Sequence, residues 1–162
     1  MFRSMRRNKQ ELPQAEAVAM LASCTSGVLA VHGDDGYPYA VPLSFAYEDG
    51  KLFFHSATAG HMPDAIERDD KVSFCVIAAD DVVPEKFTTH FRSAVAFGRA
   101  RVITDDAAKR HALRRIAEKY SPEHMDAVDA RSDEDWKRVC VFELVVERLT
   151  GKAAIALVRE SA

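Results

Sequence analysis

Residues 28–47 read VLAVHGDDGYPYAVPLSFAY and predict two antiparallel strands joined by a tight turn. The strands cover residues 28–31 and 37–47, and the turn covers residues 33–36. Within the turn, the step from Asp35 to Gly36 supplies the positive φ angles that a short hairpin requires. Because a hairpin pairs neighbouring strands without a crossover, this segment indicates an antiparallel sheet.

Further strand signals follow toward the C-terminus. A second turn at residues 48–50 leads directly into a strand at 51–55, so three strands follow one another through short links. More strands are predicted at 71–78, 91–103, 139–147 and 153–158, with an irregular loop at 80–89 and a turn at 149–152. Gly98 interrupts the longest strand, and a glycine there marks a bulge or a close approach. Crossover helices are missing between the first strands, which counts against a Rossmann sheet.

Helices are predicted around these strands rather than between them. One begins at Pro13 and runs to about Cys24, and a short one begins at Pro63 and ends near Asp70. Residues 104–120 repeat apolar side chains at helical spacing, and short helices are expected from residue 121 and over 132–138. The order predicts a mainly β fold with peripheral helices, a small closed or split β-barrel.

The composition describes one ordinary domain spanning residues 1–162. The chain is 48% hydrophobic and has a net charge of −3, so it lacks the cationic field that nucleic-acid binding requires. Cys24, Cys75 and Cys140 are widely spaced, which argues against a disulfide framework or a zinc site and favours a reducing compartment. No export signal and no apolar run of membrane-spanning length is visible, so we expect a cytoplasmic protein without a membrane partner.

The usual catalytic motifs are not found. The sequence contains no glycine-rich dinucleotide fingerprint after a strand, no P-loop, no HExxH and no GxSxG. The six histidines include no pair spaced four residues apart on a predicted helix, so no metal site is expected.

Residues 53–61, FFHSATAGH, form the most informative polar segment. A strand here ends in small and hydroxyl-bearing residues just before a helix. Hydroxyls and the free N–H groups of a helix N-terminus suit a phosphate, because the helix dipole favours negative charge. The alternative is an ordinary loop with a hydrogen-bonded histidine.

Six segments in order resemble the pyridoxamine 5′-phosphate oxidase-related flavin-binding proteins, and most closely the nitroimidazole-resistance (Nim-type) branch. They are YPYAVPLSF (37–45), KLFFHSA (51–57), Gly60-His61, KVSF (71–74), RSAV (92–95) with Gly98, and TGK (150–152). The resemblance covers nearly the whole chain. It implies an FMN-binding split β-barrel that forms a homodimer and holds FMN in a cleft between two subunits.

The resemblance also implies site residues. The isoalloxazine ring would be bordered by Val41, Pro42 and Leu43. The ribityl chain and phosphate would lie near His55 and Ser56, with His61 at the loop that enters the short helix. Ser93 is a further candidate for the phosphate, and Lys152 would lie near the N1–O2 edge of the ring. The alternatives are a core strand for the first three and a solvated turn lysine for Lys152. Many relatives have lysine directly after the Gly-His pair, whereas this chain has Met62.

These inferences predict an FMN-dependent oxidoreductase of small molecules. The resemblance implies reduction of a nitro-aromatic or similar planar acceptor, with electrons from NADH or NADPH. His55 is the candidate catalytic proton donor, because histidine titrates near neutrality. The rival interpretation is a non-catalytic protein that stores or senses FMN, haem or a related ligand.

A homodimer is also expected from the alternation of Phe53 and Phe54. Neighbouring residues of a strand point to opposite faces, so both rings cannot enter the barrel and one needs a cover. We expect a second subunit to cover it, and a helix of the same chain is the alternative.

Overall fold

The predicted hairpin is present in the computed structural model, which describes residues 2–160. Strand β2 (Gly27–His32) pairs with β3 (Pro38–Leu43) around the short 3-10 turn η2 (Asp34–Gly36). Asp35 and Gly36 have φ angles of 54° and 77°, as the tight turn requires. The second strand ends earlier than predicted, because the chain breaks after Leu43 before the short strand β4 (Ala46–Glu48).

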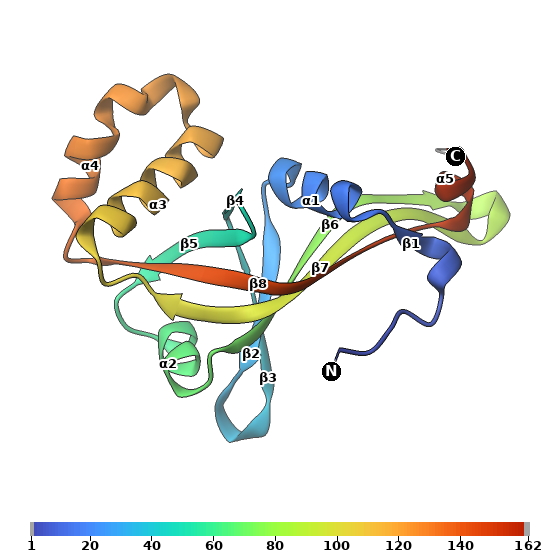
Figure 1. Cartoon of the computed structure of the whole chain (residues 1–162), viewed down its shortest axis with the longest axis horizontal. Helices are drawn as coiled ribbons and strands as arrows, with labels where there is room; N and C mark the ends of the chain where they lie inside the picture. The colour runs from blue at the N-terminus through green and yellow to red at the C-terminus, as the bar shows by residue number, and fades with distance from the viewer. Residues whose placement is uncertain (1, 161–162) are drawn as a thin grey trace.

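All strands belong to one antiparallel sheet in the order β3-β2-β6-β7-β8-β5-β4, and β1 (Glu11–Leu12) pairs with β8. The other strands are β5 (Lys51–Ala57), β6 (Lys71–Val83), β7 (Thr88–Val102) and β8 (Val139–Ala153). Figure 1 shows the three long strands crossing the whole molecule. The strongly curved sheet is a split β-barrel, which confirms the predicted fold class.

Three predicted segments were wrong. The expected loop at 80–89 is strand for most of its length, because Val82 and Val83 pair with Thr89 and Thr88 around the turn η3 (Pro84–Lys86). The expected turn at 149–152 is the last part of β8, where these residues pair with β7. The expected strand at 153–158 is replaced by helix α5 (Ile155–Glu160).

The helices lie around the sheet as predicted. They are α1 (Gln14–Ser23), α2 (His61–Arg68), α3 (Asp106–Tyr120), α4 (Val128–Asp135) and α5, with 3-10 turns η1 (Asn8–Gln10) and η4 (Pro122–Ala127). Asp105 caps α3 by accepting the Ala108 N–H at 2.8 Å. Within residues 2–160, no helix is both long enough and apolar enough to cross a membrane.

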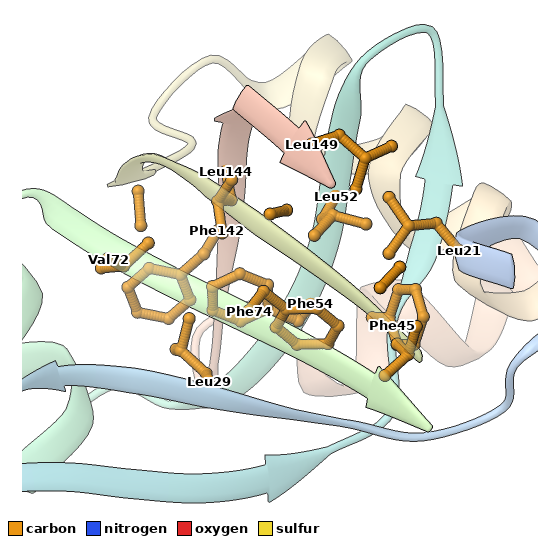
Figure 2. Packing of buried hydrophobic residues seen from close by; sticks show 14 of the residues in the cluster. Leu21, Leu29, Phe45, Leu52, Phe54, Val72, Phe74, Phe142, Leu144 and Leu149 are labelled. Carbon is orange, nitrogen blue, oxygen red and sulfur yellow. The ribbon is translucent and has the colours of Figure 1, made fainter. Parts of the chain in front are cut away.

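Aromatic rings fill the barrel interior (Figure 2). Phe54 stacks on Phe142 with ring centroids 5.3 Å apart, and Phe45 meets Phe74 edge-on at 4.7 Å. All four are fully buried, and each contributes about 1.5–3 kcal/mol relative to an exposed ring. The core therefore holds β5, β6, β8 and the break between β3 and β4 in fixed positions relative to one another.

Phe53 points to the other face of β5, as the alternation predicts. It is covered by Ala112 and Ile116 of α3 together with Val141 of β8, in a second apolar cluster. The expectation that a second subunit covers this ring was therefore wrong, because a helix of the same chain does so. Phe53 therefore gives no reason to expect a second subunit at this face of β5.

Candidate functional site

The end of β5 carries the two residues predicted to lie near the flavin side chain. His55 pairs with Val141 and Ser56 pairs with Cys140, so both lie beside the start of β8. The Ser56 hydroxyl donates to the Ala57 carbonyl oxygen at 2.7 Å. Its oxygen can still accept a hydrogen bond, but its proton reaches a ligand only if the side chain rotates.

The strand end places His55 in surroundings that lower the pKa of its side chain. Its side chain is exposed at the surface, yet neighbouring atoms displace enough water to lower its pKa below the usual 6.5. The imidazole is therefore neutral at pH 7, with one ring nitrogen carrying a proton and the other free to accept one.

His61 begins α2 and is tied to the β2–β3 turn. Its ring stacks on Tyr39 with centroids 4.0 Å apart, and its Nε2 accepts the Asp34 N–H at 3.3 Å. Because Nε2 accepts this bond, the proton lies on Nδ1, which can donate to a ligand. Arg68, at the other end of α2, pairs with the same Asp34 carboxylate at 3.1 Å. The structure thus brings the helix and β3 together through side chains of both.

The N-terminus of α2 is open to a ligand. Gly60 precedes it with φ 138°, no side chain caps it, and residues 58–61 are exposed. Uncapped N–H groups at a helix start favour an anion. Met62 points the other way, into the barrel core, with 7% of its surface exposed. The Met62 side chain therefore does not line the open start of α2.

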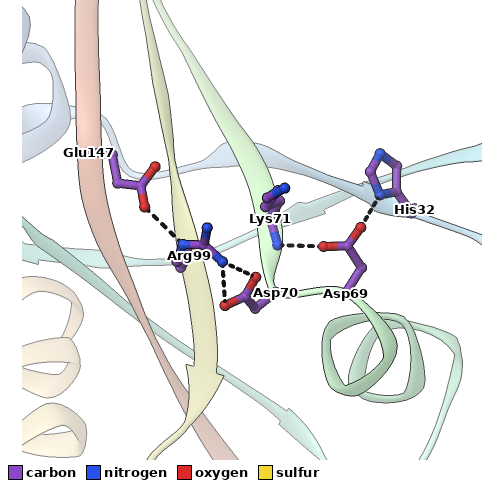
Figure 3. A network of polar contacts seen from close by, with 6 residues as sticks. All are labelled: His32, Asp69, Asp70, Lys71, Arg99 and Glu147. Carbon is purple, nitrogen blue, oxygen red and sulfur yellow. Dashed lines mark hydrogen bonds and ion pairs between the residues drawn. The ribbon is translucent and has the colours of Figure 1, made fainter. Parts of the chain in front are cut away.

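A polar network fixes the far end of α2 (Figure 3). Asp69 accepts the Lys71 N–H at 3.0 Å and pairs with His32 at 2.7 Å, and these contacts lower the pKa of its carboxyl group. Next to it, Asp70 and Glu147 bind the Arg99 guanidinium at 2.6 and 2.9 Å. The network joins four strands and fixes the chain where α2 ends.

Strand β3 is the edge of the sheet, next to the start of α2. Val41 and Leu43 pack partly against the barrel core, whereas Pro42 points outward and is exposed. The core alternative therefore holds for Val41 and Leu43, and Pro42 is accessible to a ligand. An edge strand leaves half of its backbone N–H and C=O groups unpaired, and a proline is tolerated there.

Ser93 and Lys152 are direct neighbours across β7 and β8. Lys152 lies on a strand, so the turn-lysine alternative was wrong, and its ammonium group lies 5.3 Å from the centre of the Phe91 ring. The pair is far from His55, because Val141 and Lys152 are eleven residues apart on β8, which is about 36 Å at strand spacing. One chain therefore holds the predicted site residues in two separate groups.

The outer face of the sheet is apolar between these groups. Pro42, Val28, Cys75 and Val95 form a continuous cross-strand row over four strands. Val28 and Ile77 are 38% and 65% exposed on this face. Farther along the same face is a groove of about 600 Å³ that contains none of the predicted site residues and is lined in part by Phe2, His32, Lys71 and Phe97.

Two residues of the site were not predicted, namely Tyr39 and Asp34. Tyr39 stacks on His61, and Asp34 binds both ends of α2. Both belong to the hairpin that the sequence predicted, but contact between the hairpin and α2 is long-range and leaves no local pattern. Among the described residues, no group of three or more histidine, cysteine or acidic side chains could hold a metal ion.

The curved antiparallel sheet with an open edge strand and a helix start beside it defines a split-barrel protein. The family model described as pyridoxamine 5′-phosphate oxidase matches residues 13–153, and the chain belongs to this family. No curated protein matches the chain.

Three solved structures illustrate the similarity of fold. A candidate 5-nitroimidazole antibiotic resistance protein from Bacteroides thetaiotaomicron has 24% identity and a TM-score of 0.72, over 88% of this chain and 86% of that one. The flavocytochrome Anf3 from Azotobacter vinelandii has 21% identity and a TM-score of 0.80, over 93% and 72%. The FAD and haem binding protein from Mycobacterium smegmatis has 22% identity and a TM-score of 0.78, over 90% and 73%.

Proposed function

We propose that this protein binds FMN and is a flavin-dependent oxidoreductase of small molecules, with a nitro-aromatic or similar planar compound as its acceptor. Family membership supports a flavin, and the similarity to a candidate nitroimidazole-resistance protein supports the substrate class. The observation that carries the proposal is the open N-terminus of α2 held against edge strand β3 by the His61–Tyr39 stack.

The residues present suit FMN at this place. The first N–H groups of α2 and the Nδ1–H of His61 are donors for the phosphate. Edge strand β3 leaves the backbone groups of alternate residues within 41–43 unpaired, and these groups can meet the polar edge of the ring. His55 and Ser56 lie at the neighbouring strand end, near the ribityl chain.

Bound FMN would accept and pass on hydride or electrons, and the protein would supply orientation and proton transfer. His55 is the proposed residue for that transfer, because its neutral imidazole can accept a proton on one ring nitrogen and give up the proton on the other. NADH or NADPH is the proposed electron donor.

We propose a homodimer in which each flavin site uses both chains. Ser93 and Lys152 lie too far along β8 from His55 to contact the same FMN within one chain. A second copy that covers the apolar outer face can bring its Ser93 and Lys152 to the site. Exposed apolar faces of this kind are unusual on monomers, and two-fold dimers are the commonest oligomers.

A binding protein without catalysis is the second candidate. The similar structure from Mycobacterium smegmatis is named for both FAD and haem, so FAD and haem compete with FMN as the ligand.

An absorption spectrum of the purified protein from about 300 to 700 nm, followed by anaerobic addition of NADH or NADPH, tests the proposal. We expect a flavin spectrum that bleaches, and FMN as the extracted flavin. A flavin spectrum that no nicotinamide nucleotide bleaches favours storage or sensing. A haem spectrum, or failure of FMN to bind on titration, contradicts the proposal.

A further inference from the structure

The β6–β7 hairpin extends beyond the rest of the sheet. Its last contacts with the chain after β8 are the pairing of Arg92 with Ala153 and the hydrogen bond from the Ala154 N–H to the Phe91 carbonyl at 3.0 Å. We call residues 80–91 the β6–β7 arm. In Figure 1 the arm projects at the end of the molecule opposite α3 and α4. Beyond Phe91, its two strands pair only with each other.

The arm exposes large apolar side chains at its tip. Phe87 is 98% exposed and Val82 is 69% exposed. Phe87 also adopts a left-handed backbone conformation, with φ 48°, which is uncommon for a bulky residue. Isolated two-stranded hairpins are only marginally stable in water, and exposed phenylalanine makes this one less favourable still. These features indicate that another surface covers the arm.

The arm is continuous with the apolar outer face that we propose as the dimer interface. The same strands, β6 and β7, carry Cys75, Val95 and Ile77 on that face and then extend into the arm. A copy that covers the face is therefore placed to meet the arm as well, since only the bulge between Ile77 and Ala79 separates the two surfaces.

Charge also favours a second copy of this chain. Asp80, Asp81 and Glu85 form an acidic flank on the arm, and none of them has an ion-pair partner within residues 2–160. Exposed Arg6 and Arg7 near the N-terminus are likewise without one in that range. In a two-fold dimer, the acidic arm of each chain can meet the basic segment of the other.

We propose that the β6–β7 arm crosses onto a second copy of this chain and buries Phe87 and Val82 against it, beside the flavin site that Ser93 and Lys152 complete. The position beside the flavin site rests on the proposed function. Ser93 and Lys152 pair with each other where the arm leaves the sheet. When these two residues contact the flavin of the partner chain, the turn at the end of the arm lies at the entrance of that flavin site. The arm then forms the outer wall that an incoming planar substrate passes.

The first test measures the dimer dissociation constant by analytical ultracentrifugation for the wild type, Phe87→Asp and the control Glu123→Gln, an exposed residue of η4 between α3 and α4. We expect Phe87→Asp to raise the constant by about tenfold to hundredfold, since it removes one large buried apolar contact and buries a charge. The control should stay close to the wild type. An unchanged constant for Phe87→Asp, or a wild type that is monomeric, would overturn the proposal.

The second test keeps an aromatic side chain at the tip. A photoreactive benzoylphenylalanine replaces Phe87 in one chain, which is mixed with a differently tagged chain, and Glu134 on α4 is the control position. We expect a cross-link between the two tagged chains from position 87 only. Cross-links confined to one chain would contradict the proposal.

The two proposals fail separately. If the protein binds no flavin but Phe87→Asp still weakens the dimer and position 87 still cross-links to the partner, the proposed function is wrong and the arm contact stands. If flavin binds and bleaches while neither arm test responds, the arm proposal alone is wrong.

Discussion

Gly98 allows β7 and β8 to approach each other at the bulge, and Gly98→Ala tests how closely they do so. The pairing of the two strands shifts register between Phe97 and Gly98. A Cβ atom at position 98 would overlap the Val145 carbonyl oxygen and would lie 2.9 Å from the Val145 carbonyl carbon and 2.8 Å from Leu144 Cδ2. The nearest of these atoms belong to the backbone of β8, so a change of rotamer cannot relieve the overlap.

The size of the effect follows from this contact. Overpacking of a well-packed core costs about 1–3 kcal/mol, and an overlap with backbone belongs at the upper end. For a chain of this length, a loss of about 3 kcal/mol lowers the melting temperature by roughly 6–12 °C. Thermal unfolding followed by far-UV circular dichroism measures the shift.

The matched control is Val145→Ala, which trims an exposed side chain and leaves the carbonyl in place. The double variant should be no more stable than Gly98→Ala alone, because the overlap is with the carbonyl. A melting temperature for Gly98→Ala within about 2 °C of the wild type, the scale of an ordinary surface substitution, would refute the reasoning.

Three further predictions concern the site and its supports. Tyr120→Phe removes the hydroxyl that accepts the Phe45 N–H at 2.9 Å at the break between β3 and β4, and should cost about 1–3 kcal/mol in urea unfolding; an unchanged midpoint would contradict this role. The double variant His55→Ala with Ser56→Ala should weaken FMN binding in a flavin-fluorescence titration, whereas His124→Ala should not, and equal affinities would place FMN elsewhere. Burial lowers the pKa of His55 below 6.5, so the unfolded chain binds more protons than the folded chain just below that pH. The free energy of unfolding should therefore fall as the pH drops through 6.5. Urea titrations at several pH values should show a flatter pH dependence for His55→Gln.

Local patterns predicted much of the fold because they act over short distances. The Asp35-Gly36 turn, the helix start after Asp105 and the bulge at Gly98 all follow from the conformations that these residues favour. The same reasoning failed at residues 149–152, where a Thr-Gly-Lys sequence suggests a turn. Pairing with β7 on one side keeps this segment extended, and such pairing depends on residues more than fifty positions away.

The candidate site was predictable in its parts but not in its assembly. A strand end before a helix was predicted within residues 53–61, and β5 does end at Ala57 with α2 beginning at His61. The contact of His61 with Tyr39, and the separation of Ser93 and Lys152 from His55, depend on how the sheet curves. The helix begins at His61, two residues before the predicted start at Pro63, and Met62 is therefore a helical residue whose side chain enters the core.

Native mass spectrometry of the flavin-loaded protein shows whether two chains share each flavin site. We expect a species of two 18.0 kDa chains carrying two FMN molecules, which loses flavin when it dissociates into monomers. A single chain that retains FMN as tightly as the dimer would show that one chain forms the site alone.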